Sequence, residues 1–196
     1  MLTDSLDRSI EALIRNEADI GILYGSRPRT EIETLAVHRE PIMALVGRSH
    51  PCAERTSLTL KEVCDLPLAL PVQSFGLRQL FDRVVEAKGL TPHVALSTNT
   101  LELTRRMAVL GEVITIGPAL SALREIQQGL CCAIPIDEPE FVGARSMICV
   151  HRDRALSFAA AEFLKAATQQ FDELGNRDAA NERPVKGVPS SATRPR

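Results

Sequence analysis

The stretch Leu66-Pro-Leu-Ala-Leu-Pro-Val-Gln-Ser-Phe-Gly-Leu-Arg78 decides the fold. Its first half is a short apolar run that contains two prolines, and a small loop, Gln73-Ser74-Phe75-Gly76, follows. From Leu77 onward the residues form an amphipathic pattern, so the whole stretch predicts a strand, a loop and the start of a helix. In open α/β sheets, ligands bind beyond the carboxyl ends of the strands, close to helix N-termini. We therefore expect a ligand site at this loop.

Strand and helix patterns alternate on both sides of this stretch. Apolar residues at helical spacing predict helices over residues 5–16, 59–65, 77–88, 101–110, 119–128 and 157–174. Short apolar runs predict strands over residues 19–25, 35–39, 41–47, 66–72, 92–96, 113–116, 130–136 and 145–151. Gly89, Gly111 and Gly129 are expected to stop the helices that precede them. The alternation predicts an α/β protein with mostly parallel sheets.

Bulk composition bounds the class of protein. The chain has 196 residues, 44% of them hydrophobic and 24% charged, which is typical of a globular protein with one or two domains. A net charge of −2, no tryptophan and one tyrosine argue against a surface built to attract or stack nucleic acid. The sequence has no apolar run of transmembrane length and no secretory signal pattern at its start. We therefore expect a cytoplasmic protein.

The five cysteines are Cys52, Cys64, Cys131, Cys132 and Cys149. Their number is odd, and their spacing matches neither a zinc ribbon nor a C-x-x-C motif. We interpret them as small buried thiols in a reducing compartment. A redox sensor or a metal site is the alternative. The neighbours Cys131 and Cys132 should point to opposite faces of their strand.

The composition changes after Gly175. Residues 176–196 contain Pro, Gly, Ser, Asn, Lys and Arg but almost no bulky apolar side chain. Such a segment buries too little surface to offset its ordering entropy, so residues 175–196 are predicted to be a disordered basic tail. Weak contact with nucleic acid is the alternative role for this tail.

Three expected helices begin with small hydroxyl or amide residues. These starts are Ser5, Gln73-Ser74 and Thr98-Asn99-Thr100. Each offers free backbone N–H groups and the positive end of a helix dipole, so three starts that converge would bind a small anion such as a carboxylate. The alternative is that these residues are ordinary N-caps. No P-loop, G-x-S-x-G, G-x-G-x-x-G or H-E-x-x-H motif occurs, and Ser74 has no evident His or Asp partner in the sequence.

Five segments in order resemble one known family, the effector-binding (substrate-binding) domain of LysR-type transcriptional regulators. They are Leu13-Ile-Arg-Asn-Glu-Ala-Asp-Ile-Gly-Ile22, Arg48-Ser-His-Pro51, Leu58-Thr-Leu-Lys-Glu-Val-Cys-Asp-Leu-Pro67, Val109-Leu-Gly-Glu-Val-Ile-Thr-Ile-Gly-Pro118 and Arg152-Asp-Arg-Ala-Leu-Ser-Phe-Ala-Ala-Ala161. Two departures stand out: Asn16 occupies a position where the family usually has glycine, and Glu112-Val113 replaces the second glycine of a G-x-G turn.

The resemblance implies a periplasmic-binding-protein-like fold of type 2, in which two α/β subdomains are joined by crossover strands. Subdomain I would be residues 1–66 plus 150–174 and would be incomplete, and subdomain II would be residues 67–149. The family binds its effector between the subdomains. We therefore expect the effector-binding residues to be Ser5, Gln73, Ser74, Phe75, Gly76, Thr98, Asn99, Thr100, Gly117 and Pro118. No catalytic residue, metal ion or cofactor is expected.

The function that the resemblance implies is the sensing of a small effector, anionic by our argument, in transcription regulation. The family acts as an oligomer and reads DNA through an N-terminal winged helix-turn-helix. That domain has no counterpart in residues 1–196, so DNA contact would need another polypeptide segment. Two alternatives are a solute-binding protein of the same fold and an α/β enzyme with an active site in the cleft.

Overall fold

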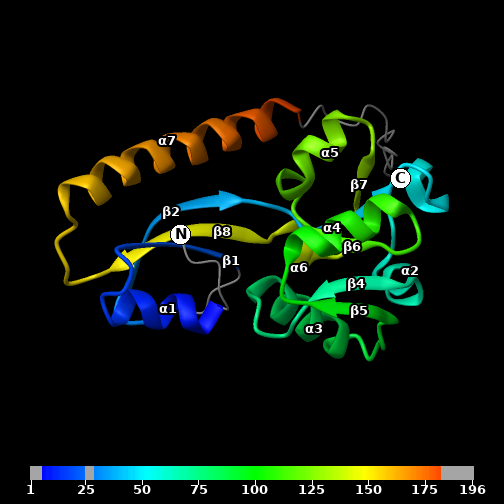
Figure 1. Cartoon of the computed structure of the whole chain (residues 1–196), viewed down its shortest axis with the longest axis horizontal. Coiled ribbons are helices and arrows are strands. Elements are labelled where there is room, and N and C mark those ends of the chain that lie inside the picture. Colours follow the sequence, from blue (N-terminus) through cyan, green and yellow to red (C-terminus); the bar gives the residue numbers. More distant parts are fainter. Residues whose placement is uncertain (1–5, 25–28, 182–196) are drawn as a thin grey trace, which may run out of the picture.

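The computed structural model describes residues 6–24 and 29–181 and shows two lobes (Figure 1). The elements of the first lobe come from both ends of the described chain. They are α1 (Leu6–Ile14), β1 (Ile20–Tyr24), β2 (Ile32–Arg39), β8 (Arg145–His151) and α7 (Phe158–Asn181). The strands form an antiparallel sheet in the order β1-β8-β2, with α1 packed beside β1 and α7 beside β2.

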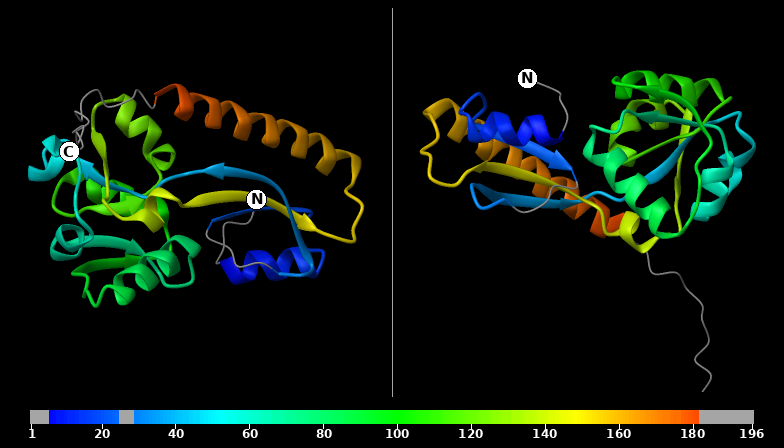
Figure 2. Two further views of the ribbon diagram at one scale, coloured as in Figure 1. Left: turned by 180° about the vertical axis from the view of Figure 1, so that it is seen from behind. Right: turned by 90° about the horizontal axis from the view of Figure 1, so that it is seen from below.

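The second lobe is formed by the middle of the chain. Its strands are β3 (Met43–Gly47), β4 (Leu68–Pro71), β5 (Val94–Thr98), β6 (Thr115–Gly117) and β7 (Cys131–Pro135). Its helices are η1 (Pro51–Glu54), α2 (Leu60–Asp65), α3 (Gly76–Ala87), α4 (Leu101–Leu110), η2 (Ala119–Ala122), α5 (Leu123–Gln127) and α6 (Pro139–Val142). Figure 2 shows that the chain passes between the lobes after β2 and returns before β8.

Hydrogen bonds join the strands of the second lobe into one sheet. β3 lies between β6 and β7, and β4 pairs with β5. The Ala69 N–H donates to Ile114 O (2.8 Å) and the Ile114 N–H donates to Pro67 O (2.9 Å), which connects β4 to the segment that leads into β6. The order is therefore β5-β4-β6-β3-β7. Four of these strands run in one direction, and only β3 runs against them.

The expectation of mostly parallel sheets needs correction. In the second lobe β4 runs parallel to β5 and to the segment that leads into β6, but β3 pairs antiparallel with both of its neighbours. The first-lobe sheet is antiparallel throughout. The antiparallel pairings arise because the chain crosses from one lobe to the other and back. β2 leaves the first lobe and β8 returns to it, so the two strands run in opposite directions where they pair. β3 enters the second lobe against the direction of the strands that flank it.

Two hydrophobic clusters define the lobes. The larger one runs from Ile42 through Leu60, Val63 and Phe81 to Phe141, and the smaller one joins α1 to the first-lobe sheet. Residues 42–66 therefore pack with the second lobe, which differs from the boundary predicted at residue 66. The predicted boundary came from the family resemblance, which placed residues 1–66 in subdomain I. The packing supports lobe boundaries near residues 41 and 145.

The last helix is longer than the sequence predicts. α7 continues to Asn181, so residues 175–181 are helical and the predicted disordered tail does not begin at residue 175. A glycine inside a helix costs only about 1 kcal/mol relative to alanine, and the strong helix formers Ala179 and Ala180 follow Gly175 in this helix. Residues 182–196 lie outside the described part of the chain.

Several local predictions are confirmed. Gly89, Gly111 and Gly129 have φ values of 64°, 87° and 70° at the ends of their helices. Asn16 also has a positive φ, 65°, which lies in the left-handed region that glycine favours. Asparagine tolerates this region better than most residues that carry a Cβ.

A capping box fixes the start of α2. The Glu62 N–H donates to Thr59 Oγ1 (3.2 Å), and the Thr59 N–H donates back to the Glu62 carboxylate (2.8 Å). Arg55 Nη2 donates to the other carboxylate oxygen at 2.9 Å. These bonds, the backbone bond from Thr59 first, lower the pKa of Glu62 to about 2. The ionised carboxylate therefore stabilises the folded chain.

We predict a pH-dependent effect of Glu62→Gln on stability. The pKa of an unfolded glutamate is about 4.3, so the stabilising effect of Glu62 is complete above that pH and is lost as the pH falls toward 2. The variant should be less stable than the parent in urea unfolding at pH 6, and the difference should shrink steadily between pH 5 and pH 2. Glu86→Gln, which removes an exposed carboxylate on α3, is the control. A difference between parent and Glu62→Gln that stays constant with pH would contradict the prediction.

Candidate functional site

Two of the three predicted loops lie side by side at one edge of the second-lobe sheet. Pro71, at the end of β4, pairs with Thr98, at the end of β5, and the Val72 N–H donates to Thr98 O (2.9 Å). The two strands are parallel, so the loops 72–75 and 98–100 leave the sheet at the same edge. The pairing register therefore makes the two loops neighbours, as an anion site formed by converging helix starts would require.

Two further predicted site residues, Gly117 and Pro118, lie at the end of β6. This strand runs parallel to β4 and lies on the opposite side of β4 from β5. Gly117 is the last residue of β6 and is buried, and Pro118 precedes η2. A Cβ atom added at Gly117 would lie 4.0 Å from Leu77 Cδ2 of α3 and 3.3 Å from Ser121 Oγ. The carboxyl ends of β4, β5 and β6 therefore bring together all of the predicted site residues except Ser5, which lies outside the described residues.

The two helices that start at this edge have no side-chain caps. Phe75 occupies the N-cap position of α3 and Thr100 that of α4, and neither accepts a hydrogen bond through its side chain. Thr98 Oγ1 instead accepts from the Thr100 N–H (3.2 Å), and Thr100 Oγ1 donates to Asn99 Oδ1 (3.3 Å). Gln73, Ser74, Asn99 and Thr100 are exposed. The alternative interpretation of these residues as ordinary N-caps does not hold for α3 and α4.

A hydrogen bond connects the first predicted loop to the other lobe. The N–H of Leu6, the first residue of α1, donates to Ser74 O at 3.1 Å. At the neighbouring position, a Cβ atom added to Gly76 would overlap the carbonyl oxygen of Tyr24 at the end of β1. The α3 start therefore lies directly against the first lobe, and only glycine permits that approach.

Tyr24 is a residue of this junction that the sequence analysis did not single out. Its ring packs against the second-lobe cluster, and its hydroxyl donates to Glu40 O (2.6 Å) in the segment between β2 and β3. Burial first, and then the charge of Glu40, raise the pKa of the hydroxyl above its ordinary value, so it remains a donor. The fact that Tyr24 is the only tyrosine of the chain gave no indication of this role.

Arg78 is a second residue that the sequence analysis missed. It is buried in α3, where its Nη1 donates to Pro71 O (3.0 Å) and its Nε to Asp82 Oδ1 (2.7 Å). The guanidinium thereby ties the first turn of α3 to the last residue of β4 and closes the loop between them. An arginine beside an apolar stripe has the same sequence pattern whether it is buried or exposed.

A shallow surface hollow of about 520 Å³ lies along the flank of α3. Gln73 is the one predicted site residue that lines it, and the other lining residues are Arg78, Asp82, Val85, Glu86, Gly89, Leu90 and Pro92. Asp82 and Glu86 make this hollow acidic apart from the paired Arg78. It is therefore a poorer place for an anion than the edge where α3 and α4 begin.

The cysteines, the possible metal ligands and the helices of residues 6–24 and 29–181 bear on other kinds of function. All five cysteines have free thiols, and burial raises the pKa of Cys131 to about 11, which disfavours a reactive thiolate. Cys131 and Cys132 belong to different clusters on opposite faces of the sheet, as the strand pattern predicted. Over the same residues no group of His, Cys, Asp and Glu side chains is arranged to hold a metal ion, and no helix is long and apolar enough to span a bilayer.

A sequence model of the LysR substrate binding domain matches residues 1–172. This chain belongs to that family. The five segments that suggested the resemblance all lie within the matched range, and the lobes joined by crossover strands are the periplasmic-binding-protein-like fold of type 2, as predicted.

Two LysR-type relatives come from Bacillus subtilis (strain 168). The HTH-type transcriptional regulator YybE is 24% identical over 164 residues, and the transcriptional dual regulator GltC is 26% identical over 167 residues. Each match covers 84% of this chain and 55% of the relative, so the chain spans about half the length of these regulators.

Solved structures show the same fold. The effector binding domain of QuiR in complex with shikimate has a TM-score of 0.70 and 19% identity, covering 86% of this chain and 79% of that one. The regulatory domain of CcmR from Synechocystis PCC6803, in complex with 2-PG, has a TM-score of 0.70 and 17% identity, covering 87% of this chain and 81% of that one. At these identities the likeness concerns the fold.

We predict that Gly76→Ala destabilises this LysR domain. The new methyl group would overlap the Tyr24 carbonyl, and relieving such overpacking costs about 1–3 kcal/mol. Urea unfolding should show a lower midpoint for the variant. Gly143→Ala is the milder comparison and should lower the midpoint less, because its Cβ would lie 3.3 Å from Pro139 O, a tight contact that falls short of an overlap. Equal midpoints for the two variants would show that the lobes do not meet as closely as the structure has them.

Proposed function

We propose that this chain is the effector-sensing part of a LysR-type transcriptional regulator and that it binds a small anion at the edge where α3 and α4 begin. The observation that carries the proposal is the set of three loops after β4, β5 and β6, which leave the sheet at one edge, where the loop after β4 contacts the first lobe. The protein is a binding module and not an enzyme, and it works in the cytoplasm as part of an oligomer.

The charge at the edge favours an anion. The residues of the three loops, 72–76, 98–100 and 117–118, include no acidic side chain. Helices α3 and α4 both present backbone N–H groups that no side chain caps, and helix N-termini attract negative charge. The nearest carboxylate on α4 is Glu102, whose pKa is lowered by a hydrogen bond from Arg106 and by the charge of Arg105, so its charge is offset by two cations.

The family membership supports the same proposal. QuiR was solved with shikimate, which is a carboxylate, and CcmR with 2-PG. Both ligands were found in domains that share the fold of this chain. We carry over to this chain only the general class, a small anion, because the identities of 17–19% do not specify a ligand.

The arrangement of the lobes indicates how binding would act. A ligand at the start of α3 lies beside the junction of Leu6, Ser74, Gly76 and Tyr24, so it interacts differently with open and closed lobe positions. Such a difference in affinity shifts the population between the two positions. Within a full regulator, the shift would change how the subunits lie on DNA, which other segments of the polypeptide would contact.

Isothermal titration calorimetry with a panel of small carboxylic and phosphorylated acids, shikimate included, tests the proposal. At least one acid should bind with measurable heat and emerge chemically unchanged by NMR. Ser74→Ala and Asn99→Ala should each weaken that binding by about tenfold, as expected for the loss of a hydrogen bond to a charged group. Ser97→Ala, which removes an exposed hydroxyl from β5, should leave the affinity unchanged.

Two results would overturn the proposal. Turnover of a panel member would indicate an enzyme. Equal effects of the Ser74, Asn99 and Ser97 variants would move the site away from the edge.

A further inference from the structure

We infer that Arg105 is a positioning residue that fixes the loop after β5 to the loop after β6, so that the two act as one rigid wall of the candidate site. The inference rests on the proposed function in one respect, since the wall belongs to the proposed anion site. The contact itself is independent of any ligand.

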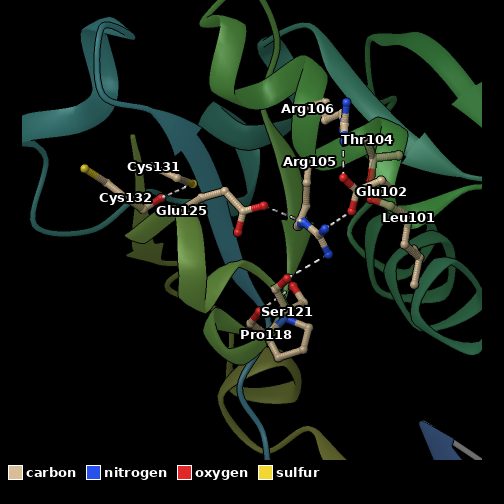
Figure 3. A network of polar contacts seen from close by, with 10 residues as sticks. All are labelled: Leu101, Glu102, Thr104, Arg105, Arg106, Pro118, Ser121, Glu125, Cys131 and Cys132. Atoms are coloured by element: carbon tan, nitrogen blue, oxygen red, sulfur yellow. Dashed lines mark hydrogen bonds and ion pairs between the residues drawn. The ribbon is translucent and has the colours of Figure 1, made fainter. Parts of the chain in front are cut away.

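Figure 3 shows Arg105 of α4 between three groups. Its Nη1 donates to the backbone oxygen of Ser121 at 2.8 Å, and its Nη2 donates to the Glu102 carboxylate one turn earlier on α4. Its Nε lies 3.4 Å from Glu125 Oε1 of α5. One planar side chain therefore connects the first turn of α4 with the η2 turn and with α5.

The turn that Arg105 holds is the one that carries Pro118. Ser121 Oγ donates to Pro118 O (2.7 Å), and the Ser121 N–H donates to the same oxygen (3.0 Å). The backbone oxygen of Ser121 accepts from Arg105. Ser121 is therefore bonded both to α4 and to Pro118. Thr100 is the N-cap of α4, two residues before Glu102, so the guanidinium connects the start of α4 with the turn that carries Pro118.

The charges argue that Arg105 positions the loops and does not itself bind the anion. Two carboxylates, Glu102 and Glu125, contact its guanidinium, so its positive charge is already balanced. The side chain is only 23% exposed, and its Nε is fully buried, with an ion pair to Glu125 and no hydrogen bond of good geometry. The N–H donors of the Arg105 guanidinium therefore point to protein groups and not to a ligand.

Arg106 provides a matched comparison on the same helix. It shares the Glu102 carboxylate, to which its Nε donates at 2.7 Å, but its side chain is 75% exposed. Its hydrogen bond ends on α4 itself and does not reach the turn at Pro118. Removing Arg106 therefore removes an arginine and a Glu102 contact and leaves the connection between the two loops in place.

Amide hydrogen–deuterium exchange on the 196-residue chain tests the inference without a ligand. In Arg105→Ala, exchange in the peptides that cover residues 118–123 should rise by about tenfold, because the turn loses its charge-assisted bond. Arg106→Ala should leave exchange in those peptides unchanged. Arg105→Lys should resemble Arg105→Ala, since one ammonium group cannot replace a planar fork that reaches three partners.

The outcomes separate this inference from the proposed function. Equal exchange in Arg105→Ala and Arg106→Ala, or unchanged exchange in both, would overturn the positioning role whatever the ligand. Exchange that rises across the whole chain would show a general loss of stability and would also overturn it. For an acid that binds in calorimetry, Arg105→Ala should weaken binding at least threefold more than Arg106→Ala. If no acid binds, the proposed function fails while the exchange result still decides the role of Arg105.

Discussion

The close approach of Gly76 to the Tyr24 carbonyl is the constraint on which the arrangement of this molecule depends. It places the first residue of α3 against the last residue of β1, and beside it the Leu6 N–H reaches Ser74 O. The carboxyl ends of β4, β5 and β6 share one edge, so the contact with the first lobe forms at the edge that carries all three loops. A side chain larger than glycine at residue 76 would force this contact apart.

The class of the fold and the elements around the candidate loops could be predicted from the sequence, because both depend on local patterns. The run 66–78 announced a strand, a loop and a helix start, and β4 and α3 formed there with bounds within two residues of the prediction. Helix stops at Gly89 and Gly111 were equally readable, since the left-handed conformation favours glycine. Five short segments in the right order then pointed to the family.

What the sequence could not show is which partner each element finds. β3 has the apolar run of any buried strand, so nothing in residues 41–47 indicated that it would lie between β6 and β7 and against their direction. Arg78 and Arg105 resemble the exposed Arg106 in their sequence surroundings, and their burial results from packing against distant segments. The role of Tyr24 could not be predicted for the same reason, because its hydroxyl donates to Glu40 O, which lies beyond the next strand.

The central position of β8 has a consequence for the order in which the chain folds. Both β1 and β2 pair with β8 alone among the described strands, and β8 spans Arg145–His151, after every strand of the second lobe. During synthesis, β1 and β2 therefore have no pairing strand until about a hundred further residues have emerged. Residues 42–144, by contrast, contain a complete sheet and the helices that cover it. Nascent chains should acquire the second lobe first, and the waiting strand edges are where chaperones would be needed most.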